Sequence, residues 1–86
     1  MSVEIHITGC GDGMYRAVLF GKEDGACPQI PLRGDVIFDD LRRAFGFTQE
    51  ELYEIKNQIQ ADQEKTAVIR LTATSHQLDS FGFVGL

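Results

Sequence analysis

The stretch Gly9–Tyr15, GCGDGMY, decides how the first part of the chain folds. It separates two β-prone runs, residues 3–8 (VEIHIT) and 14–20 (MYRAVLF). Within it, Asp12-Gly13 is typical of a two-residue type I′ turn, because glycine adopts positive φ freely and aspartate tolerates it. A phosphate-binding glycine loop leads into the N-terminus of a helix, whereas a strand follows here. The stretch therefore predicts a β-hairpin.

The position of the turn also predicts the pairing of the two strands. A turn centred on Asp12-Gly13 sets Ile7 opposite Val18 and Ile5 opposite Phe20, which gives the hairpin one wholly apolar face. In this register the residues that follow the turn at odd positions lie on the opposite face, which is expected to contact water. They are Tyr15, Ala17 and Leu19.

Residues 22–35 contain two prolines and two glycines and are expected to form a connecting loop, with a short extended piece at 29–32. Two helices are predicted next. Residues 35–46 carry apolar side chains at helical spacing and end at Gly46. The second helix begins with a capping box formed by Thr48 and Glu51 and continues to about Asp62.

The C-terminal part of the chain predicts a second hairpin. Residues 65–73 (KTAVIRLTA) alternate as a strand, residues 74–77 are expected to form a turn, and residues 78–84 (LDSFGFV) a final strand. The predicted fold is α+β, a two-layer sandwich in the order ββααββ, with a four-stranded antiparallel sheet and two helices on one face. Its length of 86 residues indicates a single domain, 1–86.

The two predicted hairpins direct apolar side chains to the face of the sheet that no helix covers. In the second hairpin Phe81 opposes Arg70 and Phe83 opposes Val68 on that face. Exposed apolar patches of this kind mark sites of protein interaction, and their centres are rich in aromatic residues and arginine. The predicted partner-binding residues are Tyr15, Leu19, Arg70, Phe81 and Phe83.

The composition argues against nucleic acids and membranes as partners. The formal net charge is −5, whereas nucleic-acid binding requires clustered lysine and arginine. Residues 41–55 (LRRAFGFTQEELYEI) resemble the first two helices of a helix-turn-helix DNA-binding domain, but the resemblance stops before a recognition helix. No apolar run reaches the roughly 18 residues of a membrane span, so a cytoplasmic protein is expected.

The sequence offers no catalytic constellation. Cys10 and Cys27 lack a nearby base and are expected to be free thiols. The predicted function is that of a non-enzymatic regulator or inhibitor that needs no cofactor and binds itself or a larger protein. The alternative is a small-molecule or metal-binding protein that uses Cys10, His6 and the loop 22–35, although no ligand spacing typical of zinc sites is present.

Overall fold

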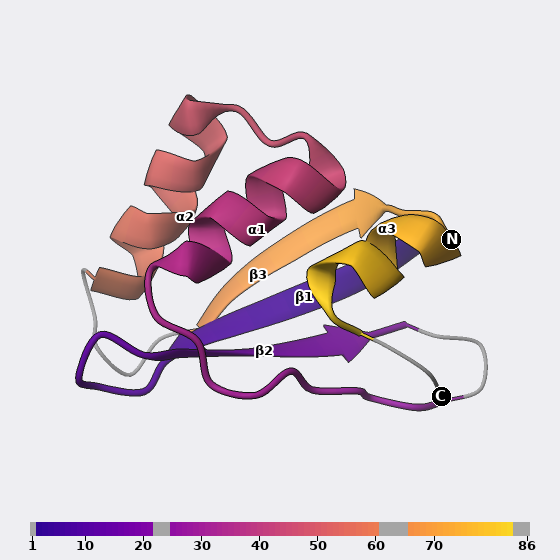
Figure 1. The fold of residues 1–86 in the computed structure, drawn as a ribbon, viewed down its shortest axis with the longest axis horizontal. Helices are drawn as coiled ribbons and strands as arrows, with labels where there is room; N and C mark the ends of the chain where they lie inside the picture. The colour runs from indigo at the N-terminus through magenta and orange to yellow at the C-terminus, as the bar shows by residue number, and fades with distance from the viewer. Residues whose placement is uncertain (1, 22–24, 61–65, 84–86) are drawn as a thin grey trace.

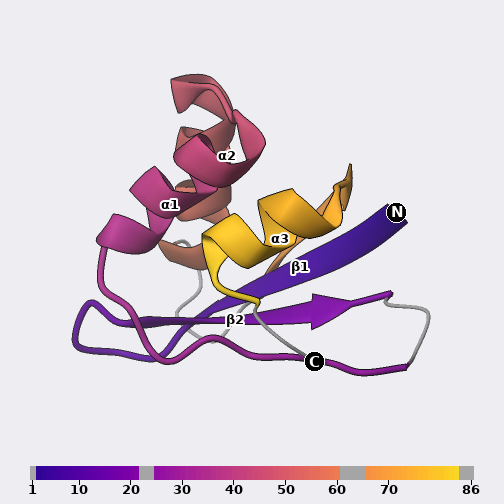
Figure 2. The same ribbon diagram turned by 45° about the vertical axis from the view of Figure 1, so that its right-hand side comes forward.

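The computed structural model describes residues 2–21, 25–60 and 66–83. Within these residues one antiparallel sheet has the strand order β2-β1-β3, and its strands are β1 (Ser2–Gly9), β2 (Tyr15–Phe20) and β3 (Thr66–Thr72). The helices are α1 (Val36–Phe45), α2 (Gln49–Gln60) and α3 (Ser75–Phe81). All three helices lie on the same side of the sheet (Figures 1 and 2). The fold is therefore α+β, with a helical layer on one face of the sheet.

The predicted four-stranded sheet in the order ββααββ is wrong, because the last segment of the chain forms helix α3. The predicted turn 74–77 is instead a capping box. The Thr74 hydroxyl accepts a hydrogen bond from the Gln77 amide at 3.1 Å, and the Gln77 side chain accepts one from the Thr74 amide at 2.9 Å. Leu78 and Phe81, which are three residues apart, are buried on one helical face. Of the predicted strand 78–84, residue 84 lies outside the described residues.

The predicted first hairpin is confirmed, and its turn has an extra residue. Asp12 and Gly13 have φ of 54° and 71°, and the Met14 amide donates to the Gly11 carbonyl at 2.9 Å, as in a type I′ turn. The Met14 carbonyl, however, accepts from the Cys10 amide at 2.9 Å. Two residues, Cys10 and Gly11, thus oppose Met14, which makes Gly11 the extra residue of a β-bulge.

This bulge shifts the register of β2 by one residue. Ile7 pairs with Ala17 in place of the predicted Val18. Because successive side chains of a strand point to opposite faces, a shift of one residue moves every β2 side chain to the other face. Tyr15 and Leu19, predicted to lie outside, are therefore buried beneath the helices.

The hydrophobic core lies between the sheet and the helical layer. It consists of the odd-numbered residues of the strands, one face of each helix, and residues from the segments beside them. Its buried members are Val3, Ile5, Ile7, Tyr15, Ala17, Leu19, Ile30, Ile37, Phe38, Leu41, Ile55, Ile59, Ala67, Ile69, Ala73, Leu78, Phe81 and Phe83.

The predictions for the two central helices are confirmed where the structure describes them. Helix α1 ends at Gly46, whose amide donates to the Arg42 carbonyl at 2.8 Å. At the start of α2 the Glu51 amide donates to the Thr48 hydroxyl at 3.2 Å, and the Thr48 amide donates to the Glu51 carboxylate at 3.0 Å. The predicted end of this helix near Asp62 lies outside the described residues.

The predicted extended piece at 29–32 runs along the outer edge of β2. It makes isolated antiparallel bridges from Gln29 to Val18 and from Arg33 to Tyr15. Arg33 then joins this segment to the helical layer, since its Nη1 donates to Asp40 of α1 at 3.0 Å and to the carbonyl of Phe81 at 2.9 Å. The edge of β2 is thereby covered, and α3 is held beside α1.

We predict that Phe81→Ala lowers the free energy of unfolding by about 3–5 kcal/mol, because a core aromatic is replaced by a cavity. The Phe81 ring lies 5.6 Å from the Phe45 ring and 5.2 Å from the Phe83 ring, between centroids. Urea denaturation measures the loss. Phe20→Ala, in the exposed part of β2, is the control and should cost less than about 1 kcal/mol. Equal losses in the two variants would contradict the burial of Phe81.

We also predict that Thr74→Ala lowers the free energy of unfolding by about 1 kcal/mol, because the amide of Gln77 loses its acceptor. Ser75→Ala is the matched control, since Ser75 is the first residue of α3 and its side chain is exposed. Urea denaturation followed by circular dichroism compares the two variants. If both lose the same stability, the capping box does not stabilise α3.

Candidate functional site

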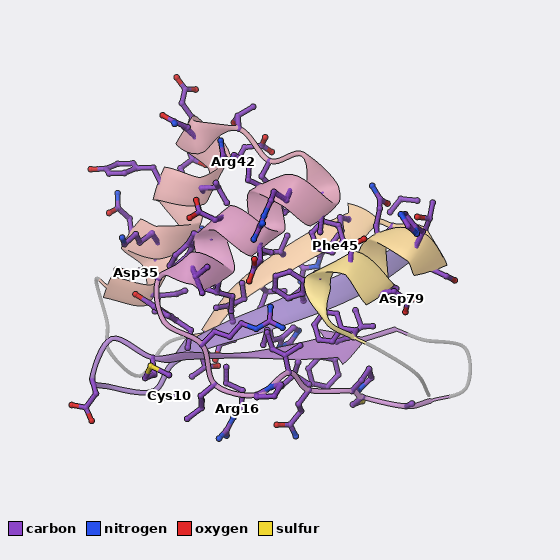
Figure 3. All side chains as sticks on the ribbon, viewed as in Figure 1. Cys10, Arg16, Asp35, Arg42, Phe45 and Asp79 are labelled. Atoms are coloured by element: carbon purple, nitrogen blue, oxygen red, sulfur yellow. The ribbon has the colours of Figure 1, made fainter. Side chains whose placement is uncertain are left out.

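The face of the sheet opposite the helices is not covered by any helix or strand of the described chain (Figure 2). We call it the outer face. It consists of Glu4, His6 and Thr8 of β1, Arg16, Val18 and Phe20 of β2, and Thr66, Val68 and Arg70 of β3. Arg16, for example, points away from the helical layer, whereas Phe45 lies within the layer, near α3 (Figure 3).

Strand pairing arranges the outer face in three rows across the sheet, each centred on one β1 residue. Glu4 stands between Phe20 and Arg70 in the first row. His6 stands between two valines in the second, and Thr8 stands between Arg16 and Thr66 in the third. A charged row, an apolar row and a polar row therefore lie side by side.

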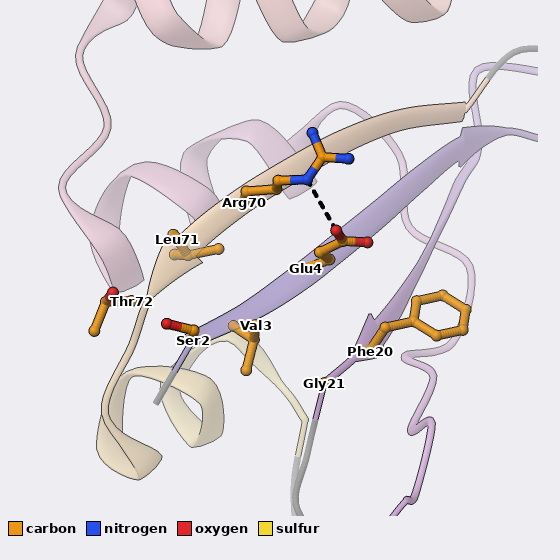
Figure 4. A pocket seen from close by; sticks show the side chains of 8 residues that line it. All are labelled: Ser2, Val3, Glu4, Phe20, Gly21, Arg70, Leu71 and Thr72. Carbon is orange, nitrogen blue, oxygen red and sulfur yellow. Dashed lines mark hydrogen bonds and ion pairs between the residues drawn. The ribbon is translucent and has the colours of Figure 1, made fainter.

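A single carboxylate joins two basic side chains in this face. Arg70 Nε donates to Glu4 Oε2 at 2.9 Å, and His6 Nε2 lies 3.0 Å from Glu4 Oε1 (the first contact is dashed in Figure 4). The hydrogen bonds from His6 and Arg70 hold the pKa of the Glu4 carboxyl below its usual value. Glu4 therefore remains ionised at neutral and mildly acidic pH.

The apolar part of the outer face adjoins this ionic cluster. The Phe20 ring lies 4.3 Å from the His6 ring, between centroids, at an angle of 47°. Phe20 is 37% exposed and Val68 is 39% exposed, and both flank β1 on neighbouring strands. Phe20 lies beside Glu4 and Val68 lies beside His6, so each exposes apolar surface to water next to the ionic cluster.

An open groove of about 630 Å³ lies where β1 begins and where β2 and β3 end (Figure 4). Its lining includes Glu4, Phe20 and Arg70, so the groove continues the charged row of the outer face. A second hollow, of about 290 Å³, is lined by Asp40, Arg43, Ala44 and Ser80 of α1 and α3. Only the first hollow combines an aromatic ring with an ion pair.

The outer face differs in charge from the molecule as a whole. It carries Arg16 and Arg70 against Glu4, a net charge of +1 with His6 neutral, whereas the complete chain carries −5. The difference places the excess of acidic groups elsewhere in the chain.

Of the predicted partner-binding residues, only Arg70 lies on the outer face. Tyr15, Leu19, Phe81 and Phe83 are core residues, none more than 7% exposed, so their predicted position on the surface is wrong. Burial, together with the nearby carboxylate of Asp35, raises the pKa of the Tyr15 hydroxyl. The Tyr15 ring packs edge-on against another core ring, that of Phe38 in α1.

Four residues of the outer face, Glu4, His6, Phe20 and Val68, were not among the predicted partner-binding residues. The alternation of β1 and β3 places Glu4, His6 and Val68 outside, but Phe20 was assigned to the apolar inner face by the wrong register. The signal that could have corrected this assignment is the number of glycines before Asp12-Gly13, because a glycine beside a tight turn is typical of a β-bulge.

His6 and Cys10 of the alternative binding site make different contacts, and residues 22–24 of its loop lie outside the described residues. His6 is engaged with Glu4 on the outer face, and the Cys10 thiol lies in the hairpin loop, 3.6 Å from the carbonyl of Thr8. Cys10 and Cys27 are free thiols, as predicted. In residues 2–21, 25–60 and 66–83, no group of three or more His, Cys, Asp or Glu side chains is placed to hold a metal ion. None of the helices described has the length and apolar character needed to span a membrane.

Comparison with known proteins adds no family to this description. The chain matches no protein-family model, no curated protein and no solved structure.

Proposed function

We propose that this chain is a protein-interaction module that binds a partner protein through the outer face. The observation that carries the proposal is the row of half-buried Val18, half-buried His6 and exposed Val68, with the exposed side chains of Phe20 and Arg70 in the next row, on the side of the sheet without a helical layer. In the proposal the chain acts without catalysis, as a regulator or inhibitor that occupies a surface of its partner.

The residue types of the outer face support a protein partner. Phenylalanine and arginine are enriched at the centres of protein interfaces, where buried aromatic rings act as anchors. Phe20 and Val68 would supply such anchors at little conformational cost, because both project from paired strands that already hold their backbones. Arg70 would supply the polar rim of the contact.

The charge of the outer face favours an acidic partner. A face with net charge +1 attracts an acidic surface at contact distance, where salt screens the charges elsewhere on the chain. A second copy of the chain that used the same face about a twofold axis would bring two positive faces together. Nucleic-acid binding requires clustered lysine and arginine, whereas the outer face carries two arginines and no lysine. The partner that fits is a protein segment with acidic and apolar side chains.

Selection of peptides by the protein tests this proposal. Random peptides displayed on phage and selected on the immobilised chain should be enriched in aspartate or glutamate next to aromatic or aliphatic residues. For a selected peptide, the double variant Phe20→Ser/Val68→Ser should weaken binding about tenfold or more, since two interface anchors are lost. Fluorescence anisotropy measures the affinity, and circular dichroism confirms that the variant is folded.

The control is Val36→Ser/Tyr53→Ser, which removes two exposed apolar side chains from helices α1 and α2. It should leave the affinity unchanged. Peptides that bind the Phe20/Val68 variant as tightly as the wild type would place the interaction elsewhere. If the wild type dimerises as its concentration rises and the Phe20/Val68 variant does not, the partner of the outer face is a second copy of the chain and not an acidic protein. Tighter binding of a single-stranded oligonucleotide than of any peptide would contradict the choice of a protein.

A further inference from the structure

Histidine 6 stands at the centre of the outer face and touches both its apolar and its ionic parts. Its Nε2 lies 3.0 Å from Glu4 Oε1, its ring contacts the Phe20 ring, and it pairs across the strands with Val18 and Val68. Its side chain is about a quarter exposed, at 28%, so a proton from solvent can reach it. A change in its charge would therefore occur within the proposed contact surface.

The groups that face His6 respond differently to pH. The charged side chains of this face are Glu4 on β1, Arg16 on β2 and Arg70 on β3, and no helix of the described chain covers it. Arginine keeps its charge at every physiological pH, and the lowered pKa keeps Glu4 ionised. Histidine alone among these residue types ordinarily changes charge between pH 5 and 8.

Glu4 also couples His6 to Arg70. The carboxylate uses one oxygen for each base, and its single negative charge is shared between them. With His6 neutral, the cluster of Glu4, His6 and Arg70 has no net charge. With His6 protonated, two cations share one carboxylate, so the ion pair between Glu4 and Arg70 weakens. The terminal nitrogens of Arg70 then become better hydrogen-bond donors to an anion of the partner.

We propose that His6 is a proton switch of the outer face: its protonation raises the charge of the face from +1 to +2 and tightens the binding of an acidic partner as the pH falls. The inference rests on the proposed function, because it assigns a regulation to the same surface. Binding and protonation are linked, so a partner that prefers the protonated face drives proton uptake when the complex forms.

The first experiment tests the switch without a partner. In an NMR titration of the full chain from about pH 7.5 to about pH 5.5, the Arg70 Nε–Hε signal and the Glu4 side-chain carboxyl signal should move with the same midpoint as the His6 ring signals. His76, exposed on α3, is the internal control, and its titration should leave the Glu4 and Arg70 signals unmoved. An Arg70 signal that stays constant while His6 titrates would overturn the inference.

The second experiment measures the effect on binding with an acidic peptide selected as above. For the wild type the affinity should rise about fivefold or more between about pH 7.5 and about pH 5.5. His6→Gln should remove this pH dependence, and His76→Gln should retain it. If His6→Gln keeps the full dependence, the switch is refuted and the interaction surface stands. If the Phe20/Val68 variant binds the peptide as tightly as the wild type does, both the proposed interaction surface and the proposed switch are refuted.

Discussion

The hydrogen bonds that Met14 makes with Cys10 and Gly11 set the register between β1 and β2, and with it the face on which each β2 residue lies. Without the extra residue, Val18 would take the place of Ala17 opposite Ile7. The side chains of β2 that now fill the core would then face water, and the arginine of β2 would be directed at the helices. Gly11 tolerates its φ of 83° because it has no Cβ, so the loop accommodates the bulge at low cost. The core and the outer face both depend on this local geometry.

Strand β1 is the central strand and pairs with both other strands, so its alternation decides which residues of the sheet share a face. Its odd residues face the helices and its even residues face outward, so Glu4 and His6 occupy the middle of the outer face. The neighbours on each side follow from the pairing. Glu4 meets the arginine of β3 only because the two residues are opposite each other, 66 positions apart in the chain. A cluster of this kind is a product of topology and leaves no motif in the sequence.

The parts of the fold that local signals determine were predictable. The capping box of Thr48 and Glu51 and the glycine after α1 gave the two central helices, because a few neighbouring residues satisfy the free backbone groups at a helix end. Helix α3 was missed although Thr74 and Gln77 form a capping box of the same kind, because Phe81 and Phe83 favour a strand by propensity and the segment was assigned to a hairpin. The Phe45 ring of α1 and the guanidinium of Arg33 pack on Phe81 of α3, and these contacts are non-local.

The candidate site was less predictable than the fold, because one error of register moves a whole strand. An exposed sheet face was expected, and no helix or strand of the described residues covers the outer face, but the aromatic side chain found there comes from β2 rather than from the C-terminal segment. The core lies between the helical layer and the inner face of the sheet. The outer face points away from it and contributes little to its packing. In the proposed function these residues serve recognition, and their net charge of +1 on a chain of net charge −5 is the basis for proposing an acidic partner.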